Sequence, residues 1–253
     1  MTPEPHRNAR LARLAANGRE GQWSLEEAID WNQAPRRPFW MTATQVRKAI
    51  SQLYHGEVAT SRLCQRLIEE LEDPEARHCL EWQLADELRH AEAYRRYLER
   101  LGGVLPMDAN LALTLSSALE GPGGTLGAMV AYHVVVEGEV LRVHDALARF
   151  LPCPLLRQIN RLVVRDEARH VAFGRIYLTP AVAALPGAAR AELSSWVRQL
   201  WSQCAGTAMD DGRRNSPVLT RFLGLWLRGG WARHAAALKH IGLTPDAHQG
   251  AQT

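Results

Sequence analysis

DELRH (residues 86–90) and DEARH (residues 166–170) are two copies of one pattern, D-E-x-R-H, in well-separated parts of the chain. In each copy the glutamate and the histidine are three residues apart, so a helix presents both on one face. A single Glu-x-x-His pair is common and usually belongs to a solvated helix surface. The repetition of the whole pattern indicates that the two copies serve one site.

Each motif glutamate is preceded by another glutamate at the same offset, Glu57 before Glu87 and Glu137 before Glu167. Asp73 marks a predicted tight turn and stands almost midway between Glu57 and Glu87. At a rise of about 1.5 Å per residue, both glutamates lie roughly 21–24 Å from the turn, level with each other on antiparallel helices. The second pair is spaced in the same way around its own proline break, so all four carboxylates are expected at mid-helix.

Four glutamates and two histidines form the ligand set of dinuclear carboxylate bundles, in which two helices give one Glu each and two give Glu-x-x-His. Hard oxygen ligands with two imidazoles suit iron or manganese. Four negative charges would neutralise two divalent cations and offset the cost of burial. The predicted metal ligands are Glu57, Glu87, His90, Glu137, Glu167 and His170.

The aspartate that opens each motif is a candidate partner for a ligating histidine, which usually gives its second ring N–H to a carboxylate. We expect a crosswise arrangement, with Asp86 serving His170 and Asp166 serving His90. The alternative is that the arginines of the motifs make each D-E-x-R-H an exposed charge cluster.

Two further histidines share the helical face of Glu137, His133 four residues before it and His144 seven residues after it. Each is interpreted as an extra ligand, a proton shuttle or a hydrogen-bonded core histidine. Glu139 lies about 200° around the helix from Glu137 and is rejected as a ligand.

Leu, Ala, Arg and Glu recur at helical spacing and hairpin signals are weak, which predicts an all-α chain. Two long antiparallel helix pairs joined by a longer crossover correspond to a ferritin-like four-helix bundle with additional C-terminal helices. The expected helices are a short one after Ser24, long ones over about 42–72, 73–102, 125–150 and 155–178, a short piece over 109–120, and two or three over 188–240. The expected domains are an N-terminal arm with a short helix (1–41), the metal-binding bundle (42–180), C-terminal helices packed on it (181–245) and a tail (246–253).

Composition excludes several classes of function. The 253 residues carry a net charge of +3 without a basic cluster, so no nucleic-acid partner is expected. No stretch reaches the length and apolarity of a membrane span or a secretory signal. The four cysteines form no C-x-x-C pair. We therefore expect a cytoplasmic protein, with a homodimer as the default assembly.

The stretch DEARHVAFG, Asp166 to Gly174, is similar to the second metal motif of the p-aminobenzoate N-oxygenase family. Over about 42–178 the chain resembles the ferritin-like dinuclear-iron proteins, and among them the ribonucleotide reductase small subunit and the oxygenases built like it. The resemblance implies two iron ions, or an iron–manganese pair, that activate dioxygen to hydroxylate or heteroatom-oxidise a small organic substrate. It also implies an electron donor or reductase.

The chain departs from these families at particular positions. Val163 stands where the N-oxygenases carry an additional histidine, so that reaction has no matching ligand here. Tyr94 stands where the reductase subunit places its radical tyrosine; it is a candidate catalytic residue, or a core aromatic near the metals. Two other functions stay open, a metal-handling ferroxidase and a radical-generating redox subunit. A ferritin cage is disfavoured because a long C-terminal segment, from Thr179 to Thr253, follows the fifth predicted helix.

Overall fold

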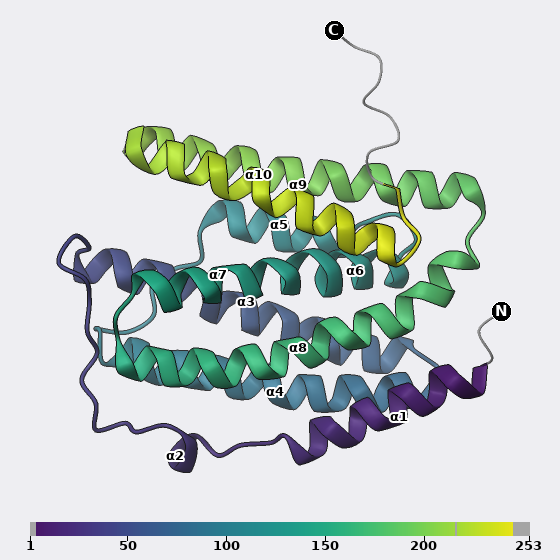
Figure 1. Ribbon diagram of the computed structural model, residues 1–253, viewed down its shortest axis with the longest axis horizontal. Coiled ribbons are helices and arrows are strands. Elements are labelled where there is room, and N and C mark those ends of the chain that lie inside the picture. The colour runs from purple at the N-terminus through teal and green to yellow at the C-terminus, as the bar shows by residue number, and fades with distance from the viewer. Residues whose placement is uncertain (1–3, 216, 245–253) are drawn as a thin grey trace, which may run out of the picture. The chain divides into compact units, whose positions relative to one another are not determined.

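A computed structural model describes residues 4–215 and 217–244, and the described part contains helices and no strand. The predicted tail, 246–253, lies outside the described residues. The helices are α1 (Glu4–Glu20), α2 (Leu25–Ala28), α3 (Ala43–Glu70), α4 (Pro74–Glu99), α5 (Ala109–Leu119), α6 (Thr125–Val130), η1 (Ala131–Val136), α7 (Glu137–Phe150), α8 (Pro154–Ala183), α9 (Gly187–Asn215) and α10 (Pro217–His240) (Figure 1). None of the described helices combines the length and apolar character that crossing a bilayer requires.

The helices form two compact units, each with its own internal contacts. The first, which we call the bundle unit, contains the described residues of Thr2–Asp108 and Val140–Phe173. It holds α1 to α4, most of α7 and the first two thirds of α8, so the four long helices of the predicted bundle all contribute to it. The second unit contains the described residues of Ala109–Glu139 and Gly174–Thr253.

Two caps fix where the first long hairpin begins and turns. Thr42 accepts a hydrogen bond from the Gln45 backbone N–H at 3.1 Å, and the Gln45 side chain accepts one from the Thr42 backbone at 2.8 Å. This is a capping box, which satisfies two backbone donors at the start of α3. Asp73 caps α4 with its carboxylate, and Pro74 follows at the first helical position.

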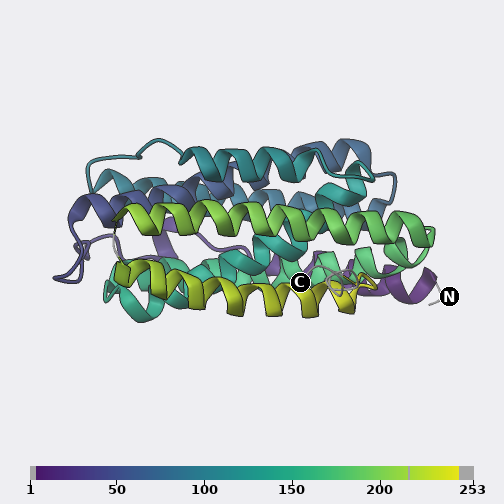
Figure 2. The same cartoon turned by 90° about the horizontal axis from the view of Figure 1, so that it is seen from above.

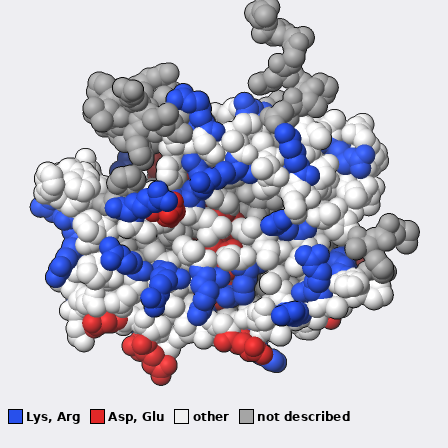
Figure 3. Space-filling view, in the orientation of Figure 1, with Lys and Arg blue, Asp and Glu red and all other residues white. Residues whose placement is uncertain are grey.

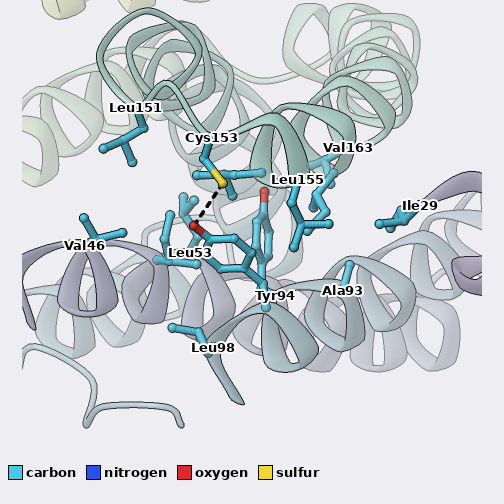
Figure 4. Packing of buried hydrophobic residues seen from close by; sticks show 14 residues of the cluster. Ile29, Val46, Leu53, Ala93, Tyr94, Leu98, Leu151, Cys153, Leu155 and Val163 are labelled. Carbon is cyan, nitrogen blue, oxygen red and sulfur yellow. Dashed lines mark hydrogen bonds between the residues drawn. The ribbon is translucent and has the colours of Figure 1, made fainter. Parts of the chain in front are cut away.

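The core of the bundle unit is a cluster of buried side chains from α3, α4, α8, the segment after α2 and the connection between α7 and α8 (Figure 4). Tyr94 and Tyr97 of α4 are its largest members and have no exposed surface. The Tyr97 hydroxyl donates a hydrogen bond of 3.6 Å to Cys153 Sγ, which satisfies the buried polar group. Val163 belongs to this cluster, so the position of the extra N-oxygenase histidine is part of the apolar core here.

The N-terminal arm contains a helix that the sequence analysis did not predict. Helix α1 is 17 residues long and packs on α4, with Leu11 fully buried and Ala15 nearly so. Its apolar stripe is narrow and most of its residues are polar, so the hydrophobic pattern is weak. The helix expected after Ser24 is a single turn, Leu25–Ala28.

The predicted helix over 125–150 is divided by the π-helical segment η1. At Gly174 of α8, an added Cβ would lie 2.5 Å from His133 Cβ, so the missing side chain lets α8 approach η1 closely. A π-helical turn is rare and is found frequently at functional sites. Helix α8 also continues to Ala183, past Pro180 and the predicted end at 178.

In the second unit, α9 and α10 lie side by side and run antiparallel (Figures 1 and 2). Trp226 and His234 of α10 both donate to Glu139, at 2.8 and 3.1 Å. The Glu139 carboxylate thus joins α10 to the first turn of α7.

Candidate metal centre

Three helices of the bundle unit bring five of the predicted ligands together. Glu57 comes from α3, Glu87 and His90 from α4, and Glu167 and His170 from α8. None of the five is more than 4% exposed. Buried ionisable side chains are costly unless they are paired or bind metal, so their convergence requires a specific reason.

The Nδ1 atoms of both histidines face the glutamates. His90 Nδ1 lies 3.3 Å from Glu57 Oε2 and 3.4 Å from Glu167 Oε1. His170 Nδ1 lies 2.9 Å from Glu167 Oε2 and 3.2 Å from Glu87 Oε1. Ligand atoms of Glu57, Glu87, His90 and Glu167 all lie within 4.8 Å of one another. Glu167 therefore stands between the two histidines.

The Nε2 atoms of both histidines face aspartates of the opposite motif. His90 Nε2 lies 3.2 Å from Asp166 Oδ2, and His170 Nε2 lies 3.1 Å from Asp86 Oδ2. This is the crosswise arrangement described in the sequence analysis. An aspartate that accepts from Nε2–H fixes the ring and leaves Nδ1 toward the glutamates as the free ligand atom.

The two motif arginines bind both aspartates. Arg89 forms an ion pair with Asp86 and lies 3.3 Å from Asp166 Oδ2. Arg169 lies 2.9 Å from Asp86 Oδ2 and 2.9 Å from Asp166 Oδ1. Their side chains are only 11% and 15% exposed, which contradicts the reading of the motifs as solvated charge clusters. The sequence already indicated a pair within each motif, because each arginine stands three residues after the aspartate of its own motif.

A segment between α1 and α2 also contacts the aspartates, and sequence reasoning missed it. Gln22 Nε2 donates to Asp86 Oδ1 at 2.9 Å, and Trp23 Nε1 donates to Asp166 Oδ2 at 2.7 Å. The Trp23 ring stacks on His90 with centroids 6.4 Å apart, and the Arg89 guanidinium lies 4.8 Å from the ring centroid. No motif marks these residues.

The carboxylates and histidines of the cluster shift one another's pKa values. Burial raises the pKa of Glu57 well above its usual value, and the charges of Glu87 and Glu167 add to this, against the opposing effect of His90. Burial alone would lower the pKa of His90, but its carboxylate partners, Asp166 first, raise it well above the usual value. Like charges crowded in a buried site are relieved by bound protons or by bound cations. Carboxylate oxygens and imidazole nitrogens are donors that fit iron or manganese.

Tyr94 lies in a buried polar group beside this cluster. Its hydroxyl is 3.3 Å from His144 Nε2 and donates to Asn160 Oδ1 at 3.3 Å. Burial lowers the pKa of His144 to about 4, so its imidazole is neutral near pH 7. Burial, with the charges of Glu57 and Glu167, raises the pKa of Tyr94 well above its usual value. The His144 ring thus has the Tyr94 hydroxyl as a hydrogen-bond partner.

The remaining two sequence candidates belong to the second unit. Glu137 is the first residue of α7 and is 2% exposed. His133, in η1, is 1% exposed, and its Nδ1–H donates to the Met129 carbonyl at 3.2 Å, as a core histidine does. Their roles toward metal stay predictions from the sequence spacing.

No family model and no curated protein matches this sequence. Solved structures do match in fold. An R2-like ligand-binding oxidase with an aerobically reconstituted Mn/Fe cofactor superposes with a TM-score of 0.74 at 17% identity, over 93% of each chain. The R2-like ligand-binding oxidase from Sulfolobus acidocaldarius gives a TM-score of 0.65 at 18% identity, over 93% of this chain and 92% of that one. The chain therefore has the ferritin-like fold of the R2-like ligand-binding oxidases, with a buried cluster of carboxylates and histidines in its bundle.

Proposed function

We propose that this chain is an oxidoreductase that binds two metal ions and uses them to activate dioxygen for the oxidation of a small organic substrate. The observation that carries the proposal is the pair of buried histidines, each with Nδ1 toward glutamates and Nε2 toward an aspartate. The ions are two irons or an iron–manganese pair, as in the Mn/Fe cofactor of the structure that shares the fold. The proposed ligands are Glu57, Glu87, His90, Glu137, Glu167 and His170.

The charge balance of the site supports two divalent ions. Four glutamates contribute four negative charges, which equal the charge of two such ions. The two aspartates are already balanced by Arg89 and Arg169, whose guanidinium groups bind both of them. The metal ions would therefore neutralise the glutamates, while the arginines neutralise the aspartates.

The chain's own residues would orient and shield the centre. Asp86 and Asp166 fix the imidazole rings through Nε2, and both Nδ1 atoms then face glutamate oxygens and would be free to hold a metal ion. The apolar cluster around Tyr94 and Val163 keeps bulk water from this side of the site. When bound, the metals supply electrons to dioxygen and so make an oxidant for hydroxylation or heteroatom oxidation.

The test is metal content after anaerobic loading with ferrous iron, alone and together with manganous ion. We expect two ions per wild-type chain and fewer than one in Glu167→Ala, and we expect dioxygen consumption by the loaded wild type and by the control variant below but not by Glu167→Ala. Glu99→Ala is the matched control, because that glutamate is 56% exposed and pairs with Arg95 on the surface. Wild-type protein without metal above background would overturn the proposal.

A second candidate is a redox subunit that stores an oxidising equivalent on Tyr94. The observation in its favour is the hydroxyl of Tyr94 between His144 and Asn160, where the neutral imidazole can accept the phenolic proton. Dioxygen treatment of the loaded protein would then give a tyrosyl radical signal that Tyr94→Phe lacks. A reaction that oxidises substrate equally well in Tyr94→Phe would exclude this role.

A further inference from the structure

The exposed face of α8 carries a row of arginines that ends at the metal centre. Arg157, Arg161 and Arg165 are exposed and follow one another at intervals of four residues, so about 6 Å separates each from the next along the helix. Lys and Arg side chains gather over α8 on this face of the molecule (Figure 3). We call these three residues the α8 arginine row.

The two arginines of the row that are farther from Asp166, Arg157 and Arg161, are not neutralised by acidic side chains of the described residues. In the described part of the chain, no ion pair is found for Arg157 or Arg161. Asp30 comes near through its backbone N–H, which donates to Gln158, but its carboxylate accepts from Asn32 and Gln33. A charged row without internal partners is available to an external anion.

The inner end of the row reaches the residues around the metal ligands. Arg165 Nε lies 3.4 Å from Asp166 Oδ1, and Arg165 Nη2 donates to the Gly21 carbonyl at 2.7 Å. The other oxygen of Asp166 lies 3.2 Å from His90 Nε2. A molecule bound along the row would therefore lie close to Asp166, which contacts the predicted ligand His90.

The proposed reaction needs electrons from outside the chain. Insertion of one oxygen atom of O2 into a substrate bond leaves the second atom, which takes up two electrons and two protons to become water. A small acidic one-electron carrier, such as a reduced [2Fe–2S] ferredoxin, supplies these electrons in two encounters and is itself oxidised. Acidic carriers are attracted to basic surfaces, and such attraction raises association rates.

We propose that the α8 arginine row is the docking surface for an acidic electron-transfer protein that reduces the metal centre. This inference rests on the proposed function, because without a redox centre the surface has nothing to deliver electrons to. It places the donor on the bundle unit, at the face formed by α8 and the segment that contains Gly21.

The experiment measures how fast the oxidised, metal-loaded full-length protein is reduced by a reduced plant-type [2Fe–2S] ferredoxin, in a stopped-flow instrument at low salt. The test variant is Arg157→Glu with Arg161→Glu. The matched control is Arg62→Glu with Arg77→Glu, which makes the same charge change at exposed positions of α3 and α4. Dithionite reduction and metal content are measured for all three proteins.

We expect the reduction rate with ferredoxin to fall at least about tenfold in the test variant, and less than about twofold in the control. The wild-type rate should fall with added salt, and the test variant should lose most of this dependence. Equal ferredoxin rates in wild type and test variant, with normal reduction by dithionite, would overturn the docking surface alone. Absence of metal, or of dithionite-reducible metal, would overturn the proposed function and the docking surface with it.

Discussion

Trp23 Nε1 donates to Asp166 Oδ2 at 2.7 Å, and the same oxygen lies 3.2 Å from His90 Nε2. One carboxylate oxygen therefore joins the segment before α2 to a histidine of the candidate centre. We expect Trp23→Phe to keep the fold and to weaken metal binding by about tenfold, because Asp166 loses a donor that holds it in place. Competitive metal titration measures the change.

The control for that variant is Trp31→Phe. Trp31 Nε1 donates to the Leu25 carbonyl at 2.7 Å. This hydrogen bond has the same length but involves no residue of the candidate metal centre. Equal metal affinity in the two variants would show that Trp23 contributes packing only.

Asp86→Asn should lower metal affinity by about 10- to 100-fold, because an amide does not hold the His170 Nε2–H as a carboxylate does. The same change also leaves Arg89 and Arg169 with one carboxylate between them. Asp145→Asn is the control, since Asp145 pairs with Arg149 at an exposed position of α7. Isothermal titration of the two variants side by side checks the prediction, and unchanged affinity in Asp86→Asn would contradict it.

The buried imidazole of His144 should make the metal-free protein less stable in mild acid. Burial lowers its pKa to about 4 in the folded state, so the unfolded chain takes up a proton that the folded chain does not. Stability from this group is present above the unfolded pKa of about 6.5 and is lost as the pH falls toward 4. Between pH 7 and pH 5 the loss amounts to about 2 kcal/mol.

Urea unfolding at both pH values measures this loss, with His144→Gln as the comparison. The wild-type free energy of unfolding should fall by about 2 kcal/mol more than that of the variant. A difference of zero would mean that His144 is protonated in the folded protein.

Gly174→Ala should destabilise the protein by about 1–3 kcal/mol or more, because the new Cβ would lie 2.5 Å from His133 Cβ. Gly229→Ala in α10 is the opposite case, since its Cβ meets no atom within 4 Å. There the substitution should be neutral or stabilising by up to about 1 kcal/mol. Thermal unfolding of both variants tests the contrast, and similar melting temperatures would show that α8 and η1 separate at little cost.

The bundle itself could be predicted from the sequence because the relevant signals are local or periodic. Thr42 and Asp73 cap their helices through side chains whose chemistry fixes the position. The position of the turn at Asp73 set Glu57 level with Glu87 without any knowledge of packing, since a helix has a constant rise. The fold class follows from such features, and the solved structures show the same fold.

Other features could not be predicted because they depend on contacts between distant segments. The long α1 has a weak apolar stripe and is held by α4. The π-helix η1 ends at Val136 and fits against Gly174, which belongs to another helix much further along the chain. Trp23 lies 143 residues from the aspartate to which it donates, and one tryptophan among eight carries no signal of that contact.

The crosswise pairing of aspartates and histidines also makes the site an interlock between two helices. Asp86 of α4 serves a histidine of α8, and Asp166 of α8 serves a histidine of α4. A slip of one helix against the other by a single turn, about 5.4 Å, would break both contacts at once. Neither D-E-x-R-H motif can therefore complete its histidine–aspartate contact without the other motif. Both contacts form only when α4 and α8 are in register.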